Sequence, residues 1–199
     1  SSSYFWAYGK FCEKYLINRF NIKKNKIFIG LQGYPKENIH FNLKKINFKN
    51  RFKSKSIVFI GYPSKRKNLG FFAKTLFKIN KNNFNLHCIG PLPKKKIKGV
   101  KYHGYLTGEQ KFDKLNDFSY AVLPSISDPW GWVVNECMSI GLPVLVSEGV
   151  MAKEMVAEKL TFNLNEKDLA QTIRFINEIS FEAYQKLSKQ CMETSNYHS

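Results

Sequence analysis

Residues 121–147, AVLPSISDPWGWVVNECMSIGLPVLVS, predict a strand, a loop, a helix and a second strand in succession. The apolar run Tyr120–Leu123 predicts the first strand, and the helix is expected to begin at Gly131. A Gly-Leu-Pro turn then leads into a second apolar strand, Val144–Val146. Ligands bind at the carboxyl ends of the strands in an open parallel sheet, so the loop after the first strand is the first candidate for a site.

Two acidic residues bracket this loop. Asp128 lies on the turn, and Glu136 lies inside the helix. The first backbone N–H groups of the helix, at Gly131, Trp132 and Val133, have no intrahelical partners and are suited to a phosphate or a sugar hydroxyl. Glu136 is suited to accept hydrogen bonds from the vicinal hydroxyls of a ribose, which predicts a nucleotide-sugar pocket. Either carboxylate taken alone is more often a solvated or capping residue, because the helix dipole favours acids near a helix start.

At these residues the sequence resembles the group 1 retaining glycosyltransferases of the two-Rossmann-domain (GT-B) class. Their signature, commonly written E-P-x-G-x-x-x-x-E-A-M-A-x-G-x-P, aligns with residues 128–143. The shared positions are Pro129, Gly131, Glu136, Met138, Gly141 and Pro143. Two positions differ: Asp128 is one methylene shorter than the usual first Glu, and Cys137 replaces a small Ala.

The resemblance implies an α/β fold, a doubly wound parallel sheet (Rossmann-like) that forms the second domain of a GT-B enzyme. Alternating strand and helix patterns through residues 56–165 indicate the same sheet. Residues 1–34 are then expected to be the tail end of the N-terminal domain, residues 35–55 an interdomain linker, and residues 56–199 the C-terminal donor-binding domain. With 199 residues, most of the N-terminal domain is expected to be missing.

Apolar spacing predicts the remaining elements. In the first part these are a helix over residues 4–20 and a strand over residues 26–31. In the second part they are strands over residues 56–61, 84–90, 100–106 and 161–164, and helices over residues 69–79, 107–118, 166–179 and 181–192. Thr107 and Gln110 have the spacing of a capping box.

The loop GYPSKRKNLG, which begins at residue 61, resembles the diphosphate-binding loop of the family. Lys67 falls on the family's Lys position, whereas Tyr62 stands where the family has an Arg. Arg66 and Lys65 are both candidates to replace that Arg. Without the downstream signature, this basic trio would be more typical of a solvated turn.

The segment VKYHGYL, which begins at residue 100, resembles the family segment that lines the nucleotide base. Tyr102, His103 and Gly104 are therefore candidates for base contacts, mostly through the backbone. Imidazole titrates near neutrality, which favours catalytic roles. The catalytic His of the family belongs to the first domain, however, so His103 is expected to be structural or to line the base.

Composition limits the classes of function. The net charge is +17, from 32 Lys and Arg against 15 Asp and Glu. Such a charge attracts nucleotide diphosphates, acidic membrane surfaces and nucleic acids, and it does not indicate which of these is the partner. The four cysteines and four histidines lack metal-ligand spacing, so no metal site or disulfide scaffold is expected. No apolar run approaches the roughly 20 residues of a membrane span, which favours a cytoplasmic protein, free or at the inner face of the membrane.

The expected function is transfer of a sugar from an NDP-sugar to an acceptor hydroxyl, with retention implied by the resemblance. Lys67 and Asp128 are the candidate catalytic residues, at the leaving diphosphate and at the donor sugar respectively. Glu136 and the amides of residues 131–133 are the candidate donor-binding groups, and neither a cofactor nor a metal is expected. The expected partners are the NDP-sugar, a carbohydrate or lipid-linked acceptor and the N-terminal domain, in surface polysaccharide or lipid-linked glycan synthesis. The charge is also compatible with peripheral contact with an acidic membrane.

Three alternatives stay open. A non-catalytic module that binds nucleotide sugars would share every feature described above. A nucleic-acid-binding protein is supported only by the charge, because an RNA-binding signature is absent, so no nucleic-acid partner is expected. An epimerase of the same fold that acts on nucleotide sugars fits the Pro-Trp-Gly run less well.

Overall fold

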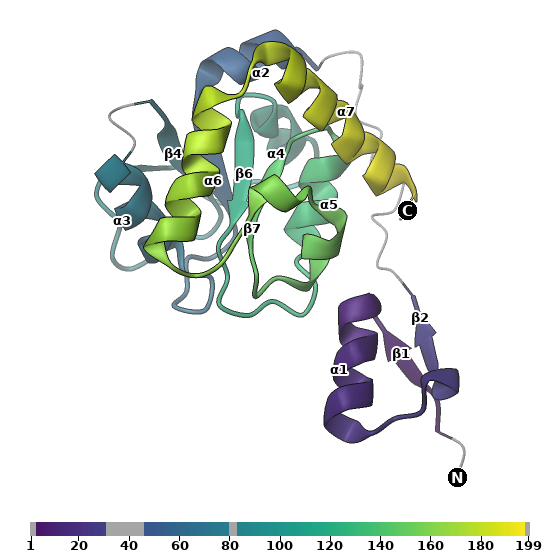
Figure 1. Ribbon diagram of the computed structural model, residues 1–199. Helices are drawn as coiled ribbons and strands as arrows, with labels where there is room; N and C mark the ends of the chain where they lie inside the picture. Colours follow the sequence, from purple (N-terminus) through teal and green to yellow (C-terminus); the bar gives the residue numbers. More distant parts are fainter. Residues whose placement is uncertain (1–2, 31–45, 80–82, 198–199) are drawn as a thin grey trace.

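Six parallel strands form the central sheet of the larger part of the structure (Figure 1). They are β3 (Ser56–Ile60), β4 (Asn85–Ile89), β5 (Val100–Tyr102), β6 (Tyr120–Leu123), β7 (Val144–Ser147) and β8 (Thr161–Phe162). The computed structural model describes residues 3–30, 46–79 and 83–197. The spatial order β5-β4-β3-β6-β7-β8 is that of a doubly wound Rossmann sheet, so the predicted fold class is confirmed.

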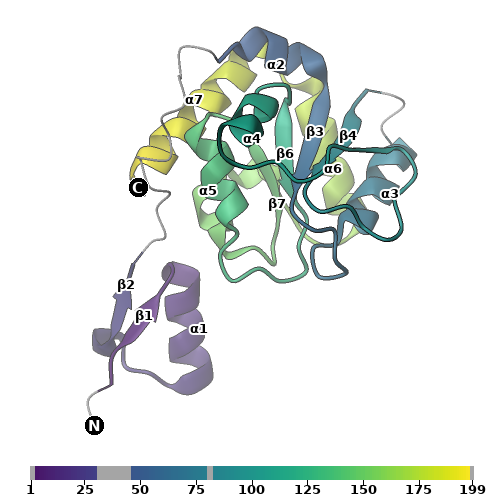
Figure 2. The same cartoon turned by 180° about the vertical axis from the view of Figure 1, so that it is seen from behind.

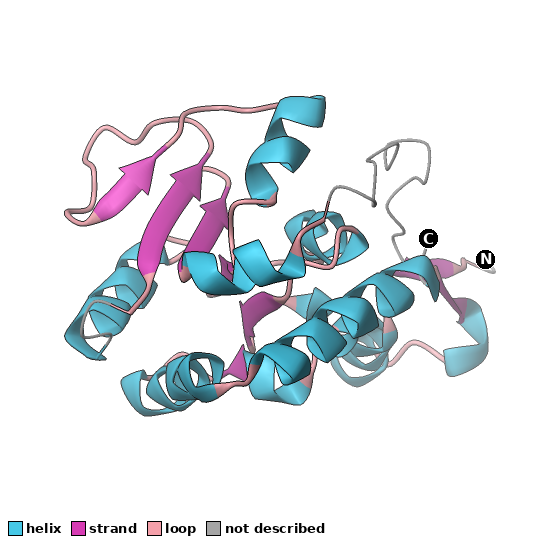
Figure 3. Ribbon diagram, turned by 90° about the horizontal axis from the view of Figure 1, so that it is seen from above, coloured by secondary structure: helices cyan, strands magenta, loops and turns pink. Residues whose placement is uncertain are grey.

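Helices cover both faces of the sheet (Figures 2 and 3). They are α2 (Phe48–Ser54), α3 (Leu69–Ile79), α4 (Gly108–Leu115), α5 (Trp132–Ser139), α6 (Glu166–Glu178) and α7 (Phe181–Tyr197), with the 3-10 segments η4 (Met151–Met155) and η5 (Glu158–Leu160). In β3, Val58 and Ile60 pack in a core with α4 and α5, while Ile57 and Phe59 pack in a second core with α3 and α6. Burial on both faces explains why the sequence of β3 is a continuous apolar run.

The strand order reverses between β3 and β6. These strands pair in parallel, with Ile57 opposite Tyr120, but the chain continues from β3 toward one edge of the sheet and from β6 toward the other. The loops that follow them therefore flank a crevice at the carboxyl ends of the strands. The two loops touch, since the N–H of Ile126 donates to the carbonyl of Arg66 over 2.8 Å.

A buried arginine joins three helices near the amino ends of the strands. Arg51, in α2, is 1% exposed. Its Nη1 donates to the carbonyl of Ile140 at the C-terminal end of α5 over 2.7 Å, and its Nη2 donates to Asn116 at the end of α4. A cation at the C-terminal end of a helix is favoured by the helix dipole. Arg51 thus fixes the C-terminal ends of α4 and α5 relative to α2.

The N-terminal residues form a small unit with parallel strands. Its elements are β1 (Phe5–Ala7), α1 (Lys10–Phe20), η1 (Lys24–Lys26) and β2 (Ile27–Ile29). The prediction of a helix over residues 4–20 is wrong for its first part, because the aromatic residues before Gly9 favour a strand and gain backbone partners from β2. The predicted turn after β2 and the boundary between residues 34 and 35 lie outside the described residues.

Two further predictions concern the larger part of the structure. The second half of the expected linker forms α2, which Asn47 caps by accepting the N–H of Asn50. The predicted capping box at Thr107 is wrong, because its side chain makes no cap hydrogen bond and lines a pocket instead. The predicted edge strand near residue 161 is confirmed as β8.

Replacing Arg51 with Met is expected to lower the free energy of unfolding by about 2–4 kcal/mol, because Ile140 and Asn116 lose a charged donor. Lys53→Met, which removes the same charge from an exposed position of α2, is the control and is expected to change stability by less than about 0.5 kcal/mol. Urea denaturation measures both variants. Equal losses in the two would contradict the role of Arg51.

Candidate functional site

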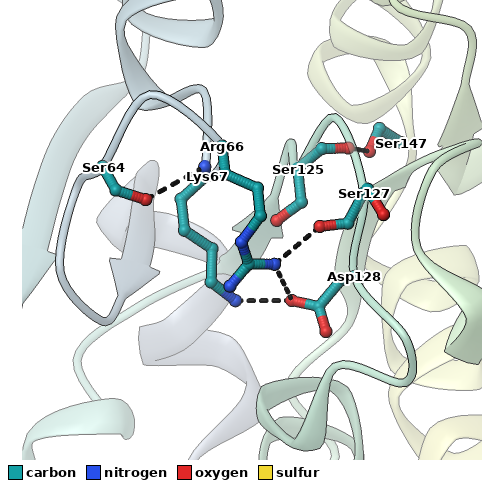
Figure 4. A network of polar contacts seen from close by, with 7 residues as sticks. All are labelled: Ser64, Arg66, Lys67, Ser125, Ser127, Asp128 and Ser147. Atoms are coloured by element: carbon teal, nitrogen blue, oxygen red, sulfur yellow. Dashed lines mark hydrogen bonds and ion pairs between the residues drawn. The ribbon is translucent and has the colours of Figure 1, made fainter.

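The two loops at the strand reversal bring two basic side chains to one carboxylate (Figure 4). Lys67 Nζ donates to Asp128 Oδ2 over 2.5 Å, and Arg66 Nη1 lies 3.8 Å from the same oxygen. Arg66 Nη1 also donates to the carbonyl of Ser127 over 2.6 Å. The side chains of Asp128 and Lys67 are 10% and 19% exposed, so this ion pair is largely shielded from water.

Contacts with the loop after β7 hold Asp128 in position. The N–H of Asp128 donates to the carbonyl of Gly149, and Ser147 Oγ donates to the carbonyl of Ser125. A Cβ at Gly149 would lie 2.1 Å from the carbonyl oxygen of Ile126, so only glycine allows the loops to approach this closely. The carboxylate of Asp128 is therefore placed by a loop attached to two strands of the sheet.

Helix α5 begins directly after this loop. Its N-cap residue, Gly131, has a φ of 93°, a left-handed conformation that favours glycine. Within the described residues, no hydrogen bond uses the backbone N–H groups of Gly131, Trp132 and Val133. The positive end of α5 therefore offers three free donors close to Asp128 in the chain.

A pocket of 290 Å³ lies at the carboxyl ends of β3 and β4. Part of its wall is backbone, because Gly61 and Gly90 both adopt positive φ angles and a Cβ at Gly90 would lie 2.4 Å from the carbonyl oxygen of Gly61. Glu136 reaches the pocket from α5 and Lys111 from α4. Lys111 Nζ donates to Glu136 Oε1 over 2.9 Å, and each side chain is 16% exposed.

The residues predicted to contact the base lie beside this pocket. Tyr102, His103 and Gly104 are not among its lining residues, whereas residues 105–108 are. The carbonyl of Gly104 accepts the N–H of Gly90 over 2.8 Å, which attaches the segment to the pocket wall. Base contact by residues 102–104 stays a prediction.

The side chain of His103 stacks on that of His87. The ring centroids lie 5.1 Å apart with an interplanar angle of 10°, and His87 Nδ1 is 2.8 Å from His103 Nε2. Phe118 packs against both rings. Burial lowers the pKa of both histidines, that of His87 to about 4, and the charges of Lys101 and Lys114 act in the same direction. The stacked rings are therefore neutral at pH 7, with one ring nitrogen donating to the other.

Of the two candidates to replace the family Arg, the structure places Arg66 at Asp128. Lys65 is exposed and makes no ion pair within the described ranges, and Tyr62 is 50% exposed. Sequence reasoning missed Lys111. The sequence pattern that could have indicated Lys111 is its distance of four residues from Thr107. This spacing places both residues on the same face of the chain at the start of α4.

Other chemistry is limited in the part of the chain that the structure describes. There, no group of three or more His, Cys, Asp or Glu side chains is placed to hold a metal ion. Cys88, Cys137 and Cys191 are buried and unpaired, as expected for cysteines that pack as small apolar residues. None of the described helices has the length and apolar character needed to cross a membrane.

Comparison with known proteins decides the family. The model of glycosyl transferases group 1 matches residues 54–178, which is more than half of the chain. The chain belongs to this family. The match covers both loops at the strand reversal and the ion pair in the pocket of this group 1 glycosyltransferase chain. No curated protein matches the sequence.

Solved structures share the fold of this group 1 chain. A glycosyltransferase from Rickettsia africae matches with a TM-score of 0.80 at 14% identity, over 99% of this chain and 59% of that one. Anabaena HepE, in complex with UDP and glucose, matches with a TM-score of 0.72 at 13% identity, over 98% and 59%. WaaG, a glycosyltransferase involved in lipopolysaccharide biosynthesis, matches with a TM-score of 0.71 at 13% identity, over 96% and 58%. This chain thus spans less than two thirds of these proteins.

The stacked histidines predict a dependence of stability on pH. As the pH falls below about 6.5 the unfolded chain binds a proton at His87, whereas the folded chain binds it only near pH 4. Acid therefore favours unfolding. The free energy of unfolding is expected to fall by on the order of 1 kcal/mol between about pH 7 and pH 5.5, where the value allows for solvent screening at the half-buried ring of His87. Thermal melting at both pH values measures this loss.

The variant His87→Gln removes the titrating group. Between about pH 7 and pH 5.5 its melting temperature is expected to change less than that of the natural chain. Ordinary carboxylates have pKa values below this pH range, so they contribute little to the difference. The groups that face the ring are His103, Lys101, Lys114 and Asp117, and they remain in the variant. An unchanged pH dependence in His87→Gln would contradict the assignment.

Proposed function

We propose that this chain is the donor-binding half of a glycosyltransferase that moves a sugar from an NDP-sugar to an acceptor hydroxyl. The observation that carries the proposal is the meeting of Lys67, Arg66 and Asp128 at the strand reversal, beside a pocket that contains Glu136. Retention of the anomeric configuration is proposed from the resemblance of residues 128–143 to the family signature.

The cationic side of the site is suited to the leaving group. During transfer the bond from the anomeric carbon to the diphosphate oxygen breaks, and negative charge develops on the diphosphate. Lys67 Nζ, the Arg66 guanidinium and the free amides of residues 131–133 supply donors for that charge. These groups supply positive charge without a metal ion, so the proposal includes none.

Asp128 has two roles in this proposal. In the free chain its carboxylate neutralises Lys67, whose ammonium group has three N–H donors and can bind a phosphate oxygen while it keeps Asp128. With donor bound, Asp128 faces the sugar and accepts a hydrogen bond from a sugar hydroxyl. Glu136 binds the ribose, and residues 102–104 contact the base.

The wider setting is also a proposal. Residues 56–199 form the donor-binding domain, and residues 1–34 belong to an N-terminal domain that supplies the acceptor site. HepE binds UDP and glucose, and WaaG acts in lipopolysaccharide biosynthesis. These relatives support a UDP-sugar donor and a role in the synthesis of surface polysaccharide or lipid-linked glycan, in the cytoplasm or at its membrane face. A non-catalytic module that binds nucleotide sugars would use the same site.

Calorimetric titration with UDP, GDP and ADP tests the donor site. One nucleotide is expected to bind, and Lys67→Ala and Glu136→Ala are each expected to weaken it by about 1.5–3 kcal/mol, because each removes a charged hydrogen-bonding partner. Lys65→Ala is the matched control, since this exposed Lys carries the same charge two residues away without contacting Asp128.

Two results would overturn the donor site. One is failure of all three nucleotides to bind the natural chain. The other is an equal loss in Lys67→Ala and Lys65→Ala, which would assign binding to the diffuse charge. Tight, salt-sensitive binding of random DNA together with no nucleotide binding would favour a nucleic-acid-binding protein.

The variant Asp128→Asn is expected to bind the nucleoside diphosphate severalfold more tightly, because it removes a carboxylate charge that repels the phosphates at Lys67. Sugar transfer by the full enzyme is expected to fall in the same variant, because the contact to the donor sugar is weakened. Calorimetry and transfer assays separate the two effects. Weaker nucleotide binding by Asp128→Asn would contradict this repulsion between the carboxylate and the phosphates.

A further inference from the structure

Lys111 occupies the pocket with a partner that the proposed function already uses. Its ammonium group donates to Glu136 Oε1, and both side chains are mostly shielded from water. Lys111 and Glu136 come from different helices, α4 and α5, so their meeting is a product of the tertiary fold. They are the charged side chains of a pocket that is otherwise lined by apolar and backbone groups, Tyr105 and Thr107.

The ion pair leaves hydrogen-bonding capacity on both sides. Within the described residues, Glu136 Oε2 has no hydrogen-bond partner, and Lys111 Nζ uses one of its three N–H groups. The pocket therefore presents a free acceptor next to free donors. A vicinal diol matches this arrangement, because one hydroxyl donates to the carboxylate while a hydroxyl oxygen accepts from the ammonium group.

Charge balance favours the same ligand. A lone carboxylate in the pocket would repel the phosphates of a nucleotide bound next to it. Lys111 cancels that charge and also fixes the rotamer of Glu136, so the acceptor oxygen is held in place before the ligand arrives. These largely shielded donors and the acceptor would be left unpaired by a sugar that lacks a hydroxyl, which is the basis of strong discrimination.

We propose that Lys111 is a specificity-determining residue which, together with Glu136, reads the vicinal hydroxyls of the donor's ribose and rejects deoxyribonucleotides. This inference rests on the proposed function, because it concerns the nucleotide bound at the same site. It adds a contact to the pocket: Lys111 donates to a ribose oxygen and positions the carboxylate that accepts from the ribose.

The test is a titration of the natural chain and its variants with UDP and its 2′-deoxy and 3′-deoxy forms. GDP or ADP and their deoxy forms are used instead if these bind more tightly. The natural chain is expected to prefer the ribonucleotide by about tenfold or more over at least one deoxy form. Lys111→Met is expected to reduce this preference to about twofold or less. The readout is the ratio of the affinities for the ribonucleotide and its deoxy forms, since a general loss of anion binding would lower all of these affinities equally.

Lys114→Met is the matched control. Lys114 lies on the same helix and carries the same charge, but it pairs with Asp117 at the surface. Its removal is expected to leave the preference for ribose unchanged. Lys111→Gln, which keeps an N–H donor without the charge, is a second variant that covers the case in which Lys111→Met fails to fold, and it is expected to retain part of the preference.

The outcomes separate this inference from the proposed function. If the natural chain binds a nucleoside diphosphate and binds both of its deoxy forms as tightly as the ribonucleotide, the inference is overturned and the donor site stands. The same holds if Lys111→Met keeps the preference for ribose, or if Lys114→Met loses it to the same extent. If the natural chain binds no nucleoside diphosphate, both fail.

Discussion

The parallel pairing of β3 with β6 is the constraint on which the rest of the site depends. Both strands end at the same edge of the sheet, and the chain leaves them in opposite directions. Lys67 and Asp128 are therefore brought into contact although 61 positions separate them in the sequence. A shift of one residue in this register would exchange the two faces of β3, both of which are buried, so packing in the two cores fixes the register.

Most of the charge in the crevice is paired, with Arg66 as an additional cation at Asp128, although the net charge of the whole chain is +17. Lys67 is paired with Asp128, and Lys111 is paired with Glu136. The side chains of each pair are largely shielded from water, which holds the pair in a defined geometry. They keep some contact with water, so the cost of desolvating their charges is reduced. Phosphates and hydroxyls can then engage the remaining donors and acceptors of side chains that are already in position. In the proposed function, the diffuse surface charge influences the approach of anions, whereas these two pairs select the ligand.

Several differences between prediction and structure have a common cause. Residues 4–9 contain too short an aromatic run to separate a strand from the start of a helix, and pairing with β2 decides the outcome. The polar and basic segment before β3 has no clear apolar period, yet it forms α2, and Arg51 of this helix donates to acceptors at the C-terminal ends of α4 and α5. In both cases the decisive partner is distant in the chain, and local spacing contains no information about it.

Local sequence was sufficient to predict the strand and helix alternation of the sheet and to select Lys67, Asp128 and Glu136 as candidate site residues. Apolar runs reflect burial on both faces, and the signature spacing reflects a loop and a helix that are adjacent in the chain. The contacts of Lys111 and Arg66, and the stacking of the two histidines, depended on tertiary structure. The physical reason is that each of these contacts joins side chains from separate elements, and only the packing of those elements brings their atoms within hydrogen-bonding distance.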